Sequence, residues 1–249
     1  MSKDPIKVYW TPYVDPSDTD WSFLYNKPVT VYSDLLLDRN KDAQVSLFAC
    51  PAFSTKFNKM LTFKCPSSFS YIYDYSKENK ILAPMTDNYI NIYETRNNVM
   101  NIGPNFKVAL GFLFFSEESL TATLTPPYFH KPQYTQTCSV IPGQFDIGNW
   151  FRPMSFEIQT WAEAGTIDFK EDEPLAYIEF NTDRNIQLQR FNMTEKTFKY
   201  SLSVMNSFDV HGRRKTLKYK YKKFKEVGFR EKILTEIKNN LLEEEPFIF

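Results

Sequence analysis

The sequence predicts a mainly β protein, an antiparallel sandwich or barrel that carries α-helices at its C-terminal end. Short segments of alternating polar and apolar residues, separated by turn residues, recur up to residue 191, a pattern typical of sandwiches and barrels. Aromatic residues, which favour strands, make up 17% of the chain. Apolar residues recur at helical spacing only after residue 191. We therefore expect a β core over residues 1–191 and a helical appendage over residues 192–249 that packs on it.

The chain before residue 120 is expected to form a series of strands. Phe69, Tyr71 and Tyr73 alternate with other residues, which is typical of a strand with one buried face. Phe106–Phe115 is apolar on both faces, as in a central strand that is covered on both sides. The expected strands are Ile6–Trp10, Pro28–Tyr32 with Leu35–Leu37 trailing it, Gln44–Ala49, Met60–Lys64 after a link over Ser54–Lys59, Phe69–Tyr75, Ile81–Pro84, Tyr89–Glu94 and Phe106–Phe115.

A β-meander over Leu120–Phe191 is expected to form one wall of this core. Its first strand, Thr121–Leu124, stops at Pro126-Pro127, because proline cannot donate a hydrogen bond to a strand ladder. Pro142-Gly143 predicts a turn, since proline presets φ and glycine accepts a positive φ. The further strands are expected at Cys138–Ile141, Phe156–Trp161, Ile167–Phe169, Leu175–Phe180 and from Ile186, with turns at Ala164-Gly165 and Lys170–Pro174.

The segment after residue 191 is expected to be helical. Thr194 is placed to cap a first helix, whose apolar residues are Phe198, Leu202 and Met205. A second helical stretch covers Arg213–Leu242. Gly228 is expected to kink it or split it into two helices, because glycine destabilises a helix interior. Pro246 is expected to end the helical segment.

Several of these strand and turn motifs resemble a family of uncharacterised phage and bacterial proteins. The resemblance covers residues 45–191 and rests on Ala49-Cys-Pro51, Leu61–Pro66, Pro126-Pro-Tyr128, Ile141-Pro-Gly143, Phe156-Glu-Ile158, Ile167 and Asp172–Phe180. The composition, rich in Asn, Lys, Phe and Tyr, is similar to that of T4-like phages of marine cyanobacteria. The resemblance implies a phage-encoded protein located in the cytoplasm of the infected host, with association with the virion left open. The family has no assigned activity.

A second resemblance concerns the shape of the core. Ile141-Pro-Gly143, followed by a strand, a turn and the Glu173–Ile178 strand, is similar to the β-clip folds of dUTPases and dCTP deaminases. This resemblance implies a jelly-roll or β-clip-like core. The nucleotide-binding and catalytic motifs of those enzymes are not evident in the chain, so it implies no activity.

No complete catalytic motif is present in the sequence. Gly-x-Ser-x-Gly, P-loop and dinucleotide-binding patterns are missing, and the chain has only 7 glycines. There is no apolar run of membrane-spanning length, and Met1–Pro5 lacks the apolar region of a signal peptide. We therefore expect an accessory or host-interaction protein that acts by binding a host or phage protein, without catalysis, cofactor or membrane contact.

A metal-dependent enzyme is the first alternative. The chain has two histidines, His130 and His211, and Asp209 lies two residues before the second. A non-haem iron oxygenase uses two histidines and one carboxylate as ligands. The three residues could form such a triad on a β-barrel, although the local order here is Asp-x-His and not the usual His-x-Asp. The sequence therefore leaves open whether the protein is an enzyme.

Nucleic-acid binding through a basic segment is the second alternative. Residues 213–232 contain ten basic residues against Glu226 and Glu231, which gives +8, while the whole chain is neutral. Aromatic residues interleave with the lysines, as in many phosphate-contacting surfaces. We favour the other interpretation, an amphipathic helix that docks on the acidic remainder of the chain. The candidate contacts for phosphate or an acidic partner are Arg213, Arg214, Lys215, Lys218, Lys222 and Lys225.

Overall fold

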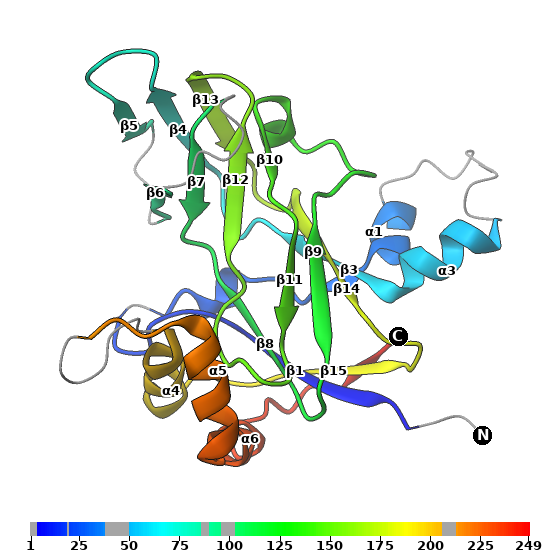
Figure 1. Cartoon of the computed structure of the whole chain (residues 1–249). Coiled ribbons are helices and arrows are strands. Elements are labelled where there is room, and N and C mark those ends of the chain that lie inside the picture. Colours follow the sequence, from blue (N-terminus) through cyan, green and yellow to red (C-terminus); the bar gives the residue numbers. More distant parts are fainter. Residues whose placement is uncertain (1–3, 19, 38–49, 86–89, 96–102, 206–212) are drawn as a thin grey trace.

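Strands and the loops between them make up most of the structure (Figure 1). The computed structural model describes all residues except 1–3, 19, 38–49, 86–89, 96–102 and 206–212. Within these residues the predicted fold class is confirmed. The protein is mainly β, its sheets are almost wholly antiparallel and sandwich-like, and the described strands do not close into a barrel.

The described strands form four sheets. The first has the order β16-β15-β1-β8, from Phe247–Ile248, Ile186–Arg190, Ile6–Pro12 and Phe112–Ser116. The second, β11-β9-β14-β3-β2, consists of Gly143–Asp146, Thr121–Thr125, Pro174–Phe180, Met60–Lys64 and Val29–Thr30. The third, β10-β12-β7-β6, consists of Cys138–Val140, Phe156–Thr160, Asn105–Val108 and Ile92–Glu94. The fourth, β13-β4-β5, consists of Ala164–Phe169, Phe69–Asp74 and Ile81–Pro84. β1 runs parallel to β15.

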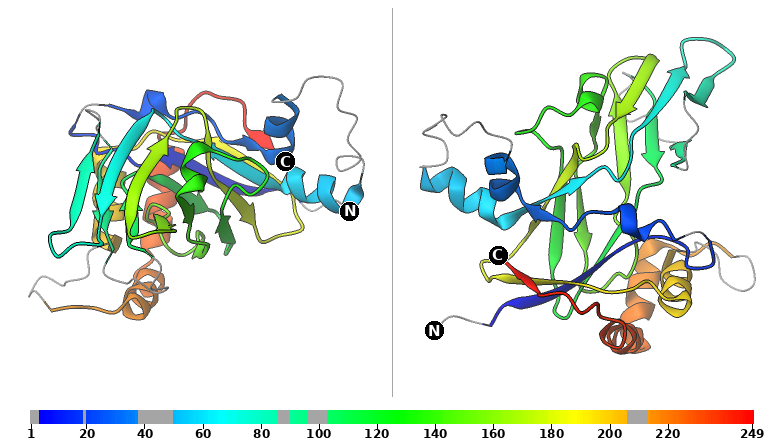
Figure 2. Two further views of the ribbon diagram at one scale, coloured as in Figure 1. Left: turned by 90° about the horizontal axis from the view of Figure 1, so that it is seen from above. Right: turned by 180° about the vertical axis from the view of Figure 1, so that it is seen from behind.

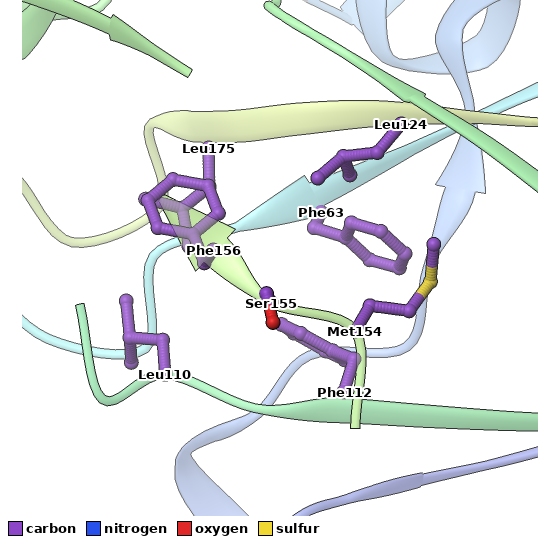
Figure 3. A pocket seen from close by; sticks show the side chains of 8 residues that line it. All are labelled: Phe63, Leu110, Phe112, Leu124, Met154, Ser155, Phe156 and Leu175. Carbon is purple, nitrogen blue, oxygen red and sulfur yellow. The ribbon is translucent and has the colours of Figure 1, made fainter. Parts of the chain in front are cut away.

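One hydrophobic core joins all four sheets. The Phe63 ring of β3 stacks on Phe112 at 4.5 Å and lies 5.5 Å from Phe114, both in β8. Beside them, Leu124, Met154 and other apolar residues surround a small cavity of about 20 Å³ (Figure 3). The cavity is lined almost wholly by apolar side chains, and a water there would lack the polar partners it needs. We therefore assign it to packing and not to ligand binding.

The strands predicted over Leu120–Phe191 are present as β9, β10, β12, β13, β14 and β15. They do not form the predicted meander or a single wall of the core, because they are distributed over all four sheets. The predicted turn at Ala164-Gly165 is wrong, because these two residues begin β13 and pair with Asp74 and Tyr73 of β4. The predicted turn at Pro142-Gly143 is also wrong, because Gly143 begins β11, a strand that was not predicted and that pairs with β9.

The predicted single strand Phe106–Phe115 is wrong. It is two strands, β7 and β8, which belong to different sheets. Gly111 marks the break: its carbonyl accepts a hydrogen bond from Tyr13 N at 2.9 Å, and a Cβ at this glycine would lie 2.7 Å from the Cβ of Tyr13. β8 is apolar on both faces because Phe112 and Phe114 contact the main core, while Leu113 and Phe115 contact the apolar cluster beneath the C-terminal helices.

Two helices replace predicted strand and link segments near the N-terminus. α1, Val31–Leu37, includes Leu35–Leu37, and α3, Pro51–Lys59, includes the expected link over Ser54–Lys59. Thr30 Oγ1 accepts a hydrogen bond from Ser33 N at 3.1 Å and so satisfies a free amide at the start of α1. Pro51 stands at the first position of α3, where proline is favoured. The predicted strand Gln44–Ala49 lies outside the described residues.

The described part of the chain also holds two short 3-10 helices, η1 (Ser22–Leu24) and η2 (Gln133–Gln136). None of the helices in this part combines the length and the apolarity needed to cross a membrane. α1 and α3 lie on one side of the β structure, and the late helices lie on the other (Figures 1 and 2).

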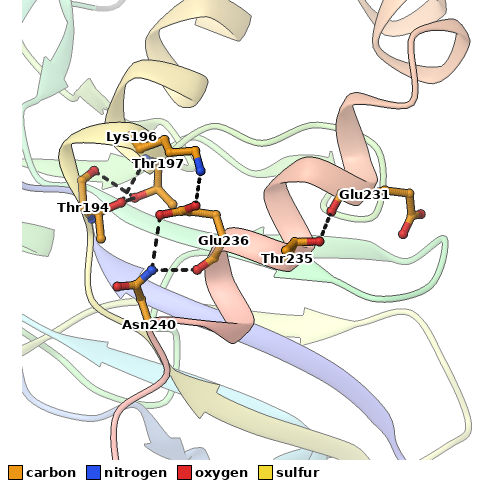
Figure 4. Close-up of polar contacts among 7 residues, drawn as sticks. All are labelled: Thr194, Lys196, Thr197, Glu231, Thr235, Glu236 and Asn240. Carbon is orange, nitrogen blue, oxygen red and sulfur yellow. Dashed lines mark hydrogen bonds and ion pairs between the residues drawn. The ribbon is translucent and has the colours of Figure 1, made fainter.

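The late helices are confirmed as α4 (Glu195–Met205), α5 (Leu217–Glu226) and α6 (Phe229–Lys238). Their predicted end is wrong, because α6 ends at Lys238, well before Pro246. Thr194 caps α4 as predicted, since its Oγ1 accepts from Thr197 N at 3.1 Å. Figure 4 shows this cap and the ion pair between Lys196 of α4 and Glu236 of α6. The buried face of α4 is not the predicted one: Leu202 is exposed, and the buried residues are Thr197, Ser201 and Val204.

The split at Gly228 is also confirmed. Gly228 separates α5 from α6 and adopts φ 61°, a left-handed conformation that glycine adopts at little cost. The helices pack on Tyr9, Phe115 and Trp150 of the β structure. After α6, the chain returns as β16, which pairs with β15 and was not predicted from the sequence. The segment after residue 192 therefore contributes to a sheet as well as to the helices.

Candidate functional site

The six basic residues singled out by the sequence lie on and just before α5. Arg213 and Arg214 are exposed and Lys215 is half-buried, in the stretch that leads into the helix. Lys218, Lys222 and Lys225 are exposed on α5 itself. Thr216 begins the helix, because its side chain accepts a hydrogen bond from Tyr219 N at 3.3 Å. The structure therefore brings the predicted cations together on one short element.

Aromatic contacts hold α5 against the β structure. The Tyr221 ring stacks on Trp150 with ring centres 4.1 Å apart. Phe224 is only 5% exposed. Its ring packs in T-shaped geometry against the rings of Phe115 and Phe229, with ring centres 6.4 and 5.8 Å apart. Burying aromatic rings in this way contributes a large part of a docking energy. The helix is amphipathic and docked, as the favoured interpretation of the sequence requires.

The charges of α5 are not neutralised in the way that interpretation expected. Among the described residues, the ion pairs of its lysines are those of Lys222 and Lys223 with Glu226, at 3.7 and 2.8 Å. Glu226 belongs to the same helix. The contact with the β structure is made by aromatic rings, and all the lysines of α5 except Lys220 are exposed. Exposed pairs of this kind offset little charge and contribute little stability.

A pocket of about 460 Å³ lies beside this helix. Ser203 and Val204 at the end of α4 form one wall. The opposite wall is one face of α5, because residues three and four apart in a helix lie side by side. The full lining consists of Ser203, Val204, Arg213, Lys215, Tyr219, Lys220, Lys223, Phe224, Val227 and Phe229. The pocket thus combines four cations with three aromatic rings.

Lys220 connects the two walls of the pocket. Its Nζ donates to the carbonyl of Val204, in the last turn of α4, at 3.3 Å. Burial lowers the pKa of Lys220, and the positive charge of Arg152 lowers it further. At the mouth of the pocket, Lys215 Nζ lies 4.9 Å from the centre of the Tyr219 ring. Lys220 therefore positions the walls, and Lys215 and Lys223 remain closer to solvent.

His130 belongs to a different, buried cluster between β14 and α1. Its Nδ1 lies 2.5 Å from the hydroxyl of Tyr177. That hydroxyl also accepts the backbone N–H groups of Phe129 and His130, both at 3.2 Å. Because both lone pairs are then used, the hydroxyl hydrogen is directed to Nδ1. This assigns the ring hydrogen of a neutral His130 to Nε2.

Asp34 completes the cluster. Its Oδ2 lies 3.3 Å from His130 Nε2, and its Oδ1 lies 2.7 Å from Lys64 Nζ. The approach of His130 does not have the angles of a well-directed hydrogen bond, and the two atoms have no other hydrogen-bond partner among the described residues. Burial raises the pKa of Asp34, but the contacts with His130 and Lys64 outweigh it and leave the pKa below its ordinary value.

This cluster fastens α1 to the sheet, since Asp34 lies in α1 and Tyr177 in β14. The other two members of the predicted iron triad, Asp209 and His211, lie outside the described residues, so the triad stays a prediction. Elsewhere in the described chain, no group of three or more His, Cys, Asp or Glu side chains is placed to hold a metal ion. No local sequence pattern marks Asp34 or Tyr177 as partners of His130.

Comparisons of the chain with protein-family models, with curated proteins and with solved structures find no match. The phage origin, the host location and the protein partner therefore stay predictions. The chemistry of the basic pocket and of the α5 surface is the basis for the function proposed below.

Proposed function

We propose that the protein is a nucleic-acid-binding protein that contacts phosphates through the outer face of α5. The observation that supports this most is the way the helix is held. Phe224 and Tyr221 dock it by apolar contacts, while its lysines pair, among the described residues, only within the helix. A basic face that is rigidly held and not used for docking is suited to an anionic polymer.

The energy of such binding would come from counterion release. Each lysine or arginine that neutralises a phosphate frees a condensed cation, which makes affinity fall steeply with salt. Lys218, Lys222 and Lys225 are exposed and lie on the same short helix. The negative charge on the rest of the chain would keep nucleic acid away from other surfaces, since like charges repel.

Fluorescence anisotropy with labelled oligonucleotides at several salt concentrations tests this function. We expect the slope of log K against log salt to be about −0.9 for each duplex phosphate neutralised and about −0.7 for each single-strand phosphate. Replacing Lys218, Lys222 and Lys225 with Gln should reduce the slope by about two to three. The fold should persist, because exposed lysines contribute little stability.

A matched control changes the same number of charges elsewhere. Lys27, Lys131 and Lys170 are exposed and lie outside the C-terminal helices. Changing all three to Gln should leave the salt slope unchanged. If the control triple weakens binding as much as the α5 triple, the contact is general charge attraction and not the α5 face. If neither DNA nor RNA binds, the proposed function is wrong.

A further inference from the structure

The pocket beside α5 has an apolar floor that phosphate contacts alone do not require. Val204 and Phe224 are 6% and 5% exposed, and Phe229 packs beside them. A phosphate is bound by cations and N–H groups at a surface, and a buried apolar floor adds nothing to that. The floor matches the flat, weakly polar face of an aromatic ring. The volume of the whole pocket, about 460 Å³, lies in the range of ligand-binding pockets.

The rim of the same pocket carries the opposite chemistry. Arg213, Lys215 and Lys223 line it together with Tyr219, whose side chain is 43% exposed. A ligand that fits both parts is a ring with a negative charge on either side. A nucleotide within a strand has this form, because a phosphate flanks each base. Proteins that hold single strands combine a cationic groove with aromatic rings in this way.

We propose that this pocket receives one unpaired nucleobase, with its flanking phosphates on the rim cations, so that the protein prefers single-stranded over duplex nucleic acid. The proposal rests on the function proposed above and adds the class of ligand. In a duplex the bases are stacked and paired, and a base must be unstacked before it can enter a pocket. A single strand presents its bases without that cost.

The walls of the pocket are preorganised for such a ligand. The Lys220–Val204 contact at 3.3 Å fixes the distance between α4 and α5. The Thr216 cap fixes the first turn of α5, which carries Tyr219. Gly228 turns the chain so that Phe229 faces Phe224. A preformed pocket reduces the ordering cost of binding.

An oligonucleotide with one central run of abasic sites tests the proposal, because it keeps the phosphates and removes the bases. We expect the intact single strand to bind about tenfold or more tightly than its abasic form, from the usual contribution of one stacked base. It should also bind more tightly than the matched duplex at the same salt. The exposed ring of Tyr219 would stack on a base that enters from the rim. Tyr219→Ala should therefore remove the preference for the intact strand while keeping the salt slope, and Tyr219→Phe should retain the preference.

Tyr93→Ala is the matched control, since Tyr93 is exposed on β6, outside the pocket. This variant should change the affinity for neither the intact strand nor the abasic strand. Equal binding of intact and abasic strands would overturn the base pocket and leave the phosphate-binding function standing. Polyglutamate that competes as well as the single strand would also overturn it, because the pocket would then bind negative charge without any contribution from a base. Loss of all nucleic-acid binding would remove the underlying function too.

Discussion

The hydroxyl of Tyr177 satisfies three groups at once. It accepts two backbone N–H groups and faces His130 Nδ1, in a residue with no solvent exposure. Tyr177→Phe keeps the ring but leaves these groups without a partner. Each buried polar group left unpaired costs about 1–3 kcal/mol, so we expect the free energy of unfolding to fall by at least about 2 kcal/mol in urea denaturation. Tyr93→Phe, at an exposed site, should change it by less than about 0.5 kcal/mol.

Asp34 should make the stability of the protein depend on acid pH. Burial favours its neutral form, but His130 and Lys64 outweigh this effect and hold the pKa of the folded carboxyl below its ordinary value. A lowered folded pKa means that the carboxylate contributes stability above the unfolded pKa, about 3.9. That contribution is lost as the pH falls from about 4 through the folded pKa.

Asp34→Asn removes this carboxylate and keeps the shape of the side chain. We expect the variant to be less stable than the wild type at pH 7, with the difference shrinking below about pH 4. Urea denaturation at several pH values between 7 and 3 measures it. A difference that stays constant over this range would mean that the carboxylate charge does not stabilise the fold.

At the scale of the element, Gly228 gives the most direct test of local backbone geometry. Its φ is 61°, and a Cβ added there would have no atom within 4 Å. Gly228→Ala should therefore cost only the backbone strain of the left-handed conformation, about 1–2 kcal/mol. Gly228→Asn should cost less, because asparagine adopts this conformation more readily. Thermal unfolding followed by circular dichroism compares the two, and equal losses would contradict the assigned cause.

Elements with a strong local pattern could be predicted, and the others could not. Polar and apolar residues alternate clearly in β12 and β15, and a glycine inside a helical pattern predicts the break at Gly228. α1 was missed because Val31-Tyr32 favours a strand locally, while the contacts that make it a helix come from distant residues such as Tyr177. The break between β7 and β8 was hidden because both strands are apolar. The Asp34–His130 pair depends on the tertiary fold alone.

In the whole molecule, the residues that carry the net positive charge are different from those that form the core. The sheets and their aromatic core hold the structure together, and the net positive charge is concentrated in residues 213–232. The sequence predicted this charge and the helices that carry it. It did not predict the pocket, because Ser203 and Val204 at the end of α4 meet α5 only in the folded protein. The proposed phosphate contact uses the predicted basic helix alone, whereas the proposed base pocket also needs this contact between α4 and α5.

The salt dependence of nucleic-acid binding shows most directly whether α5 contacts phosphates. The affinity of the wild type and of the Lys218, Lys222 and Lys225 triple Gln variant should be measured with one single-stranded probe across a range of salt. If α5 contacts phosphates, the wild type should show a steep negative slope and the variant a slope about two units shallower. Equal slopes, or no binding that responds to salt, would contradict it.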